Sequence, residues 1–237
     1  MSKNSLKEWL SSFLFPAMDW VQVEVSTYCN ASCIYCPRTV YHDTWLNRHM
    51  PLATFKKLLP AFAKTRLVFL QGWGEPFLNP NFFKMVSIAK DAGCRVGTTT
   101  NGMLLDDEKI SRIVRSGVDV VAFSLAGAGD KNDTVRKGTR LEKVLGTIRG
   151  LDRSKKGLGT TQPEIHIAYM LLRSGINDVA KLPRLLQGLG VSQVVITTLD
   201  FLPAIELADE AIIPDNEAEY NALRSRLEAV VTEGERC

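Results

Sequence analysis

Six short apolar segments, each rich in β-branched residues, alternate along the chain with segments of helical periodicity. The expected strands are 20–25, 67–71, 95–99, 118–124, 165–171 and 194–198. The expected helices are 51–64, 81–92, 106–116, 132–153, 178–188 and 216–233. Strands that alternate strictly with helices pair in parallel through right-handed crossovers. The sequence therefore predicts an α/β fold with parallel strands.

Two architectures satisfy this alternation, a partial (βα)6 TIM-like barrel and an open, doubly wound sheet, and both bind ligands at the carboxyl ends of their strands. In the first expected strand, Gln22, Glu24 and Ser26 alternate with valines. In the fifth, His166 and Met170 share one face. Side chains two residues apart point to the same side of a strand, so this pattern indicates a polar lumen with helices outside. Glu24 and His166 are candidate proton carriers there, although an interior structural role is the more common one.

Composition and charge are those of an ordinary globular domain: 45% of the 237 residues are hydrophobic and 23% are charged. We expect one domain, 1–237, with a short amphipathic helix at 5–15, a barrel over about 20–200 and a last helix at 216–233. The net charge of +3 gives no electrostatic footprint for nucleic acid or an anionic membrane. The sequence has neither an apolar run long enough to span a bilayer nor an export signal, which predicts a cytoplasmic protein with no membrane partner.

Three cysteines, Cys29, Cys33 and Cys36, fall within eight residues directly after the first expected strand. In a reducing compartment, closely spaced thiols indicate metal ligands more often than disulfides. A structural zinc site needs a fourth ligand, which His42 or His49 could supply. An iron-sulfur cluster held by only three thiolates instead leaves one iron open to an exogenous ligand. Cys94, at the start of the third strand, is expected to be a small buried hydrophobe.

The segment Cys29-Asn-Ala-Ser-Cys33-Ile-Tyr-Cys36 resembles the CxxxCxxC signature of the radical S-adenosylmethionine (radical SAM) enzymes. The resemblance implies a partial (βα)6 barrel and a 4Fe-4S cluster bound by the three cysteines. It also implies that S-adenosylmethionine chelates the open iron and is cleaved reductively to a 5′-deoxyadenosyl radical, which abstracts hydrogen from a substrate. An electron donor such as a flavodoxin or ferredoxin would be needed. The resemblance does not identify a catalytic side chain.

Other strand ends extend the resemblance. The segment Gly72-Trp73-Gly74-Glu75-Pro76 is similar to the family's GGEP stretch, with Trp73 in place of the first glycine. The cofactor-binding residues that the resemblance implies are Tyr35, Gly72, Trp73, Gly74, Glu75, Asn101, Ser124 and Arg136. Taken alone, these segments indicate surface turns and a solvated helical arginine. The segments 170–177 and 197–200 follow the last two strands and are expected near adenine or the substrate.

The chain is also similar to the barrel portion of SPASM-type members, which continue into a cysteine-rich extension that holds auxiliary clusters. Cys237 stands where such an extension would begin, so we expect either a truncated chain or a compact form without auxiliary clusters. This likeness favours a peptide or a cofactor precursor as substrate. Two other classes of function stay open: a zinc-stabilised binding module, and an iron-sulfur electron carrier or inactive scaffold.

Overall fold

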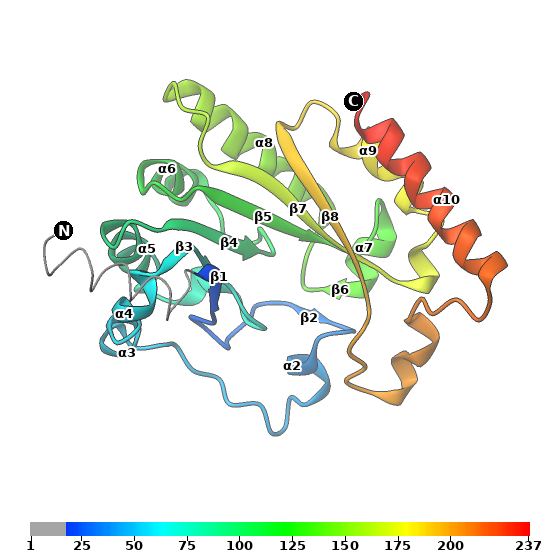
Figure 1. Cartoon of the computed structure of the whole chain (residues 1–237), viewed down its shortest axis with the longest axis horizontal. Helices are drawn as coiled ribbons and strands as arrows, with labels where there is room; N and C mark the ends of the chain where they lie inside the picture. Colours follow the sequence, from blue (N-terminus) through cyan, green and yellow to red (C-terminus); the bar gives the residue numbers. More distant parts are fainter. Residues whose placement is uncertain (1–17) are drawn as a thin grey trace, which may run out of the picture.

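The computed structural model describes residues 18–237 and has an arched sheet of six parallel strands with helices on its convex side (Figure 1). The strands are β1 (Met18–Val23), β3 (Thr65–Leu70), β4 (Arg95–Thr100), β5 (Val120–Leu125), β7 (Glu164–Leu171) and β8 (Val191–Thr198). They are hydrogen-bonded in the order β1-β3-β4-β5-β7-β8. A doubly wound sheet would reverse its order at a switch point. The sequential order and the curled sheet confirm the partial barrel. The expected helix 5–15 lies outside the described residues.

The helices of the described residues differ widely in length, from four residues to eighteen. They are α2 (Pro37–Val40), α3 (Leu52–Lys56), α4 (Leu59–Phe62), α5 (Phe82–Asp91), α6 (Asp107–Arg115), α7 (Asp130–Val135), α8 (Leu141–Gly157), α9 (Leu182–Leu186) and α10 (Glu217–Gly234). Four 3₁₀ turns are η1 (Pro76–Leu78), η2 (Arg173–Gly175), η3 (Val179–Lys181) and η4 (Ile205–Glu210). Asp106 caps α6 by accepting a hydrogen bond from the Lys109 amide at 2.8 Å, as its residue type predicts. Asp178 makes no such cap.

Three predicted helices differ from the structure. The expected helix 51–64 is divided into α3 and α4, and the expected helix 178–188 is reduced to η3 and α9. The expected helix 132–153 is interrupted at residues 136–137, which form strand β6 (Arg136–Lys137). This strand pairs antiparallel with β2 (Ser32–Cys33), and Gly138 then turns the chain with a φ of 88°. The long-range pairing outweighs the local helical pattern. In addition, α8 continues to Gly157, into a segment expected to be a loop.

The main core lies between the convex side of the sheet and the helices that cover it. Phe123, Ile148 and Ile165 are fully buried there. Strand β7 alternates strictly between buried residues on this side and half-buried residues on the concave side, where His166 and Met170 lie. The predicted polar lumen is thus a concave face. The first strand follows the prediction only in part, because β1 ends at Val23 and Ser26 is buried.

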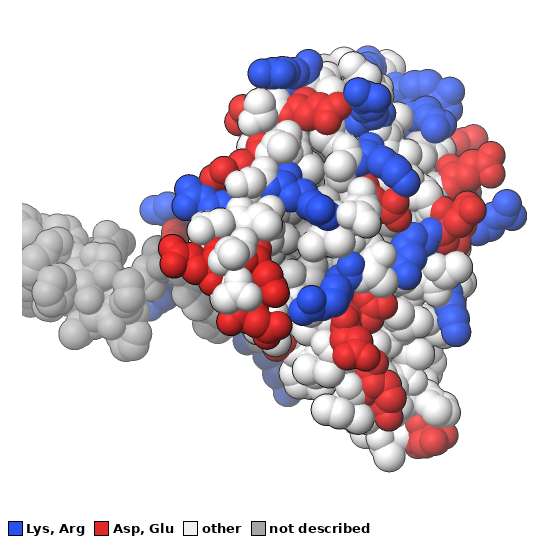
Figure 2. All heavy atoms as spheres, turned by 90° about the vertical axis from the view of Figure 1, so that its right-hand side faces the viewer, with Lys and Arg blue, Asp and Glu red and all other residues white. Residues whose placement is uncertain are grey.

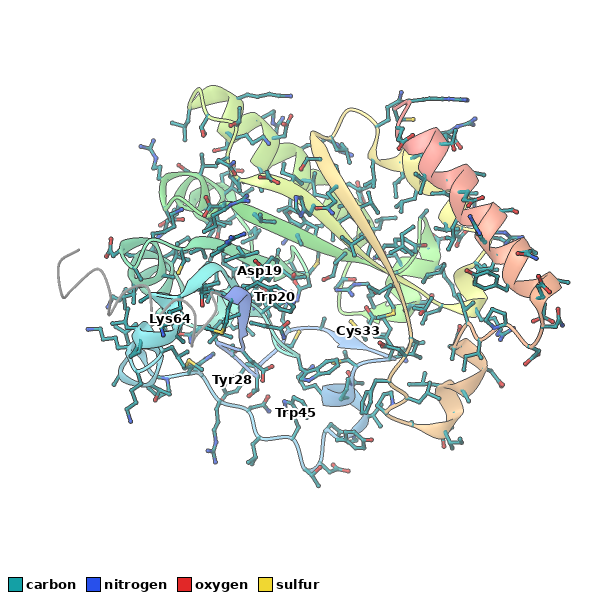
Figure 3. The ribbon with its side chains drawn as sticks, in the orientation of Figure 1. Asp19, Trp20, Tyr28, Cys33, Trp45 and Lys64 are labelled. Carbon is teal, nitrogen blue, oxygen red and sulfur yellow. The ribbon has the colours of Figure 1, made fainter. Side chains whose placement is uncertain are left out.

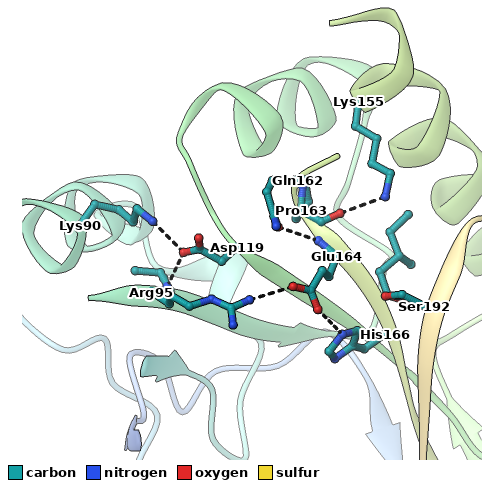
Figure 4. Close-up of polar contacts among 11 residues, drawn as sticks. Lys90, Arg95, Asp119, Lys155, Gln162, Pro163, Glu164, His166 and Ser192 are labelled. Carbon is teal, nitrogen blue, oxygen red and sulfur yellow. Dashed lines mark hydrogen bonds and ion pairs between the residues drawn. The ribbon is translucent and has the colours of Figure 1, made fainter. Parts of the chain in front are cut away.

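A set of charged contacts joins the strands at their amino ends (Figure 4). The Asp119 carboxylate accepts hydrogen bonds from the Lys90 ammonium and from the Val96 amide, both at 2.7 Å. Glu164 bridges Arg95 at 2.8 Å and His166 at 3.2 Å. Partial burial acts to raise the pKa of Glu164, but the hydrogen bond from His166 and the charge of Arg95 bring it below its ordinary value.

The surface carries charges of both signs. On the face that includes α10, Lys and Arg side chains are interspersed with Asp and Glu side chains (Figure 2). Within residues 18–237, no helix has the combination of length and apolarity that crossing a membrane would require.

We expect Asp119→Ala to lower the free energy of unfolding by about 1–3 kcal/mol, because the Val96 amide loses its hydrogen-bond acceptor. The Asp119 side chain is only 16% exposed, so the contact is largely shielded from water. Urea denaturation followed by circular dichroism measures this change. The matched control is Asp91→Ala, which removes an exposed carboxylate at the end of α5. It should change the stability by less than about 0.5 kcal/mol. Equal effects of the two substitutions would contradict the role of Asp119.

Candidate active site at the carboxyl ends of the strands

A cavity of about 220 Å³ lies on the concave side, at the carboxyl ends of the strands. It brings together residues from seven separate segments of the chain. Its lining residues are Cys29, Ala31, Cys33, Tyr35, Cys36, Gln71, Gly72, Trp73, Gly74, Glu75, Thr99, Thr100, Asn101, Ser124, Arg136, Ala168, Met170 and Thr197. The three clustered cysteines and all of the cofactor-binding residues that the resemblance implies are in this set.

The three clustered thiols lie on one loop, which we call the cysteine loop (residues 28–36). Cys33 is in β2, and its Cα is paired with that of Arg136 in β6. Cys36 directly precedes α2, and its amide donates to the Cys33 carbonyl at 3.1 Å. In Figure 3, Tyr28 and Cys33 lie on the concave side of the arched sheet. The short β2–β6 ladder therefore fixes the middle of the loop over the cavity.

All five cysteines are free thiols, and the clustered ones sit in a partly desolvated environment. Burial raises the pKa of the Cys29 thiol and that of the Cys36 thiol, even though nearby backbone amides act to lower both. Ligand thiols must lose a proton when they bind a metal, so metal binding here would release protons.

The side chains available as ligands indicate which inorganic group the three thiols could bind. Among residues 18–237, no three His, Cys, Asp or Glu side chains gather closely enough to hold a single metal ion. Thiolates that bind different irons of one cluster need no such close approach. His42 is exposed and paired with Asp43 at 3.1 Å, while His49 contacts Ser26 at 3.1 Å, and neither lines the cavity. The three thiols fit a multi-iron cluster better than a zinc ion.

The glycine-containing loop 72–75 borders the thiols. The Trp73 carbonyl oxygen lies 4.0 Å from the Cys36 sulfur, and the Trp73 side chain is 50% exposed at the rim. The Glu75 amide donates to the Tyr28 carbonyl at 2.7 Å, which joins this loop to the cysteine loop. A Cβ on Gly74 would overlap the carbonyl oxygens of Ser26 and Tyr28, and it would lie only 2.6 Å from the oxygen of Tyr28. Only glycine permits this packing.

The Glu75 carboxylate is turned into the protein and is 2% exposed. It accepts hydrogen bonds at 2.8 Å from the Thr100 hydroxyl and at 2.8 Å from the Asn101 amide, both at the end of β4. Burial raises the pKa of Glu75, and these donors partly offset the shift. The resemblance implies that Glu75 binds the cofactor, and Glu75 does line the cavity. In the structure its carboxylate oxygens accept hydrogen bonds at the end of β4.

Asn101 and Arg136 approach the thiols from opposite sides. The Asn101 side-chain amide donates to the Asn30 side chain at 2.9 Å and lies 3.8 Å from the Cys29 sulfur. Arg136 is 6% exposed and donates to the Tyr35 hydroxyl, so the interpretation as a solvated helical arginine is wrong. Its Nε is buried without a hydrogen-bond partner among residues 18–237. Burial raises the pKa of Tyr35 to about 12, against the influence of Arg136, so the phenol stays neutral.

The cavity lining also includes residues outside the set of cofactor-binding residues that the sequence suggests, notably Gln71, Thr99 and Ala168. The Gln71 amide accepts from the Thr99 hydroxyl and donates to Gln22 at 3.0 Å, which forms a polar row across three strands. The alternation of each strand carries the signal that could have found them, since they share the concave face with Ser124. Of the two later segments, Met170 and Thr197 line the cavity. Arg173, Asn177 and Asp200 do not.

Cys94 is buried on the far side of the fold, where its thiol contacts the Phe62 carbonyl at 3.3 Å. The prediction that it is a small buried hydrophobe is confirmed.

The loop after Cys36 is held at two points: the Tyr41 hydroxyl donates to the Pro203 carbonyl at 2.6 Å, and the Trp45 indole donates to the Thr27 carbonyl at 3.2 Å.

Comparison with known proteins identifies the family. Residues 23–162 match the family described as the radical SAM superfamily, which is more than half of the chain. The chain belongs to the radical SAM superfamily. Members of this family are enzymes that use a 4Fe-4S cluster and S-adenosylmethionine, in agreement with the cofactors that the sequence suggests.

Relatives of known name are longer than this radical SAM chain. The tungsten-containing aldehyde ferredoxin oxidoreductase cofactor-modifying protein of Pyrococcus furiosus is 27% identical over 221 residues, which are 92% of this chain and 61% of that protein. The GTP 3′,8-cyclase of Chlorobaculum tepidum is 29% identical over 187 residues, 75% of this chain and 52% of that protein. The chain thus spans half to three-fifths of the length of these relatives.

Solved structures show the same fold. The radical SAM chain superposes on Streptococcus suis SuiB bound to S-adenosylmethionine with a TM-score of 0.74 and 13% identity, covering 98% of this chain and 52% of SuiB. SuiB has also been solved with its precursor peptide SuiA, and that structure gives a TM-score of 0.69 with 13% identity, covering 98% of this chain and 51% of SuiB. At this level of identity, the likeness concerns the fold.

We expect Glu75→Gln to lower the free energy of unfolding by about 1–3 kcal/mol, because Thr100 and Asn101 donate to different carboxylate oxygens and the amide nitrogen that replaces one of them cannot accept a hydrogen bond. Denaturation in urea under oxygen-free conditions measures the change. Glu142→Gln, an exposed carboxylate in the first turn of α8, is the control and should leave the stability unchanged. If Glu75→Gln were as stable as the original chain, the carboxylate would not hold the strand ends.

Proposed function

We propose that this chain is the barrel of a radical SAM enzyme in which Cys29, Cys33 and Cys36 bind a 4Fe-4S cluster and the adjoining cavity binds S-adenosylmethionine. The convergence of three free thiols with a glycine-containing loop at one cavity carries the proposal. Three thiolates for four irons leave one iron for the cofactor. We also propose that the chain forms one barrel domain, with α10 as the last helix of that domain.

The cluster and the cofactor, when bound and reduced, would supply a radical that removes a hydrogen atom from the substrate. The chain's own residues would bind and orient the cofactor. The unpartnered Nε of buried Arg136 suits a carboxylate, and the backbone carbonyls of loop 72–74 suit an ammonium group. The Ser124 hydroxyl suits a ribose hydroxyl, and Asn101 lies beside the thiols. Tyr35 holds the Arg136 side chain in place.

The substrate is proposed to be a cofactor precursor or a peptide that enters the concave face. That face is polar below the cavity, where Gln22 and His166 lie, so it can hydrogen-bond a polar substrate. The names of the relatives point to the same two classes: one modifies a cofactor, another cyclises GTP, and SuiB binds a precursor peptide. Reduction of the cluster would need an electron donor such as a ferredoxin or flavodoxin.

We expect Cys33→Ala to reduce the iron bound after oxygen-free reconstitution from about four atoms per chain to near background, because the cluster loses one of three ligands. The release of 5′-deoxyadenosine on reduction with dithionite should fall with it. Cys94→Ala is the matched control: it removes a thiol on the far side of the fold and should retain both iron and 5′-deoxyadenosine release. Iron analysis and chromatography of the nucleoside measure the two outcomes.

The same preparation separates the other classes of function. A zinc-stabilised module would hold one zinc and remain colourless. An electron carrier or inactive scaffold would hold iron and absorb near 400 nm, yet release no 5′-deoxyadenosine. A Cys33→Ala chain that still released 5′-deoxyadenosine would be incompatible with the proposed ligand set.

A further inference from the structure

Glu24 contacts the backbone of loop 72–75 from a neighbouring strand. It follows β1 directly, is half-buried on the concave face, and places its Oε1 2.6 Å from the Trp73 amide nitrogen. The same oxygen lies 3.4 Å from the Gly74 amide nitrogen. One carboxylate oxygen therefore accepts from two consecutive backbone amides. Two hydrogen bonds to one side-chain acceptor restrain the backbone of the loop.

The sequence of the loop is adapted to this contact. A Cβ on Gly72 would overlap the Oε1, Cγ and Cδ atoms of Glu24. The carboxylate can reach the two amides only because residue 72 has no side chain. The Glu24 side chain and the Gly72 backbone therefore pack together, although the two residues are 48 positions apart in the sequence.

The contact also decides where the carbonyl groups of the loop point. In a trans peptide group the N–H and the C=O lie in one plane and point in opposite directions. Because the amides of Trp73 and Gly74 point at Glu24, the carbonyls of Gly72 and Trp73 point away from it. The Trp73 carbonyl accordingly lies 4.0 Å from the Cys36 sulfur, and both residues line the cavity.

We infer that Glu24 is a positioning residue for S-adenosylmethionine, which acts through the amides of Trp73 and Gly74 to aim the carbonyls of Gly72 and Trp73 at the amino group of the cofactor. The inference rests on the proposed function. It assigns Glu24 no proton transfer and no direct contact with the cofactor. A neutral acceptor at residue 24 should then preserve most of the effect, whereas the loss of any acceptor should not.

The first test compares variants of Glu24 in the reconstituted full chain by equilibrium dialysis with S-adenosylmethionine. We expect Glu24→Ala to weaken binding of S-adenosylmethionine about 10- to 100-fold. This is the range of loss found when a residue that supports a metal-ligating side chain is removed. Glu24→Gln retains an acceptor oxygen and should stay within about threefold of the original chain. Iron content and melting temperature should be unchanged in both. Asp19→Asn, which removes an exposed carboxylate from the same strand, is the control.

The second test is a double-mutant cycle. Gly72→Ala alone should weaken binding because its methyl group displaces Glu24. In the Glu24→Ala chain the obstacle is gone, so Gly72→Ala should add no more than about a twofold loss. Such non-additivity is the signature of residues that act through one contact. This cycle stays informative even where a single variant is less stable, because it compares the effect of Gly72→Ala in the original chain with its effect in the Glu24→Ala chain.

Three results would overturn the inference. Unchanged binding by Glu24→Ala would show that the contact does not position the loop. Equal losses in Glu24→Gln and Glu24→Ala would indicate a direct charge contact with the cofactor. Additive losses in the cycle would separate Glu24 from Gly72. Failure of the proposed function would look different, because the original chain would then hold iron without binding S-adenosylmethionine.

Discussion

The Glu75 carboxylate lies almost fully buried where β3, β4 and the cysteine loop meet, and it accepts hydrogen bonds from Thr100 and from the Asn101 amide. Its own amide donates to the Tyr28 carbonyl. A buried carboxylate without such donors would cost several kcal/mol, so the three segments are held in one relative position. The thiols owe their place above the strand ends to this position. Glu75, which is predicted to bind the cofactor, thus also joins separate segments of the fold.

Two further contacts complete the restraint of the site. The β2–β6 ladder pairs Cys33 with Arg136, and Glu24 holds the amides of Trp73 and Gly74. In each case a residue near the cysteines is fixed by one that is distant in sequence. Preorganised backbone groups cost no reorganisation when a ligand binds, which suits the cofactor-binding role proposed for this cavity. Small residues at Gly72 and Gly74 make this close packing possible.

The differences between prediction and structure gather near the site. The pattern of residues 132–153 is helical by periodicity, yet Arg136 and Lys137 form a strand, because pairing with the cysteine loop satisfies their backbone. Arg136, which the helical pattern taken alone would leave solvated, is consequently buried beside the thiols. The outer elements agree better: α5, α6 and α10 end within a residue or two of their predicted bounds. Local side-chain caps by Asp106 and Asn216 begin α6 and α10, whereas the site depends on contacts across the fold.

The sequence by itself determined the number and direction of the strands in the six-stranded sheet, the polar concave face and the family. Periodicity and the spacing of Cys29, Cys33 and Cys36 are local properties of the chain. Only the tertiary structure decided which way each polar group faces. It turned Glu75 inward, buried Arg136, and placed Glu24 beneath loop 72–75. The physical reason is that a buried polar group must find partners, and those partners come from strands that the chain brings together only on folding.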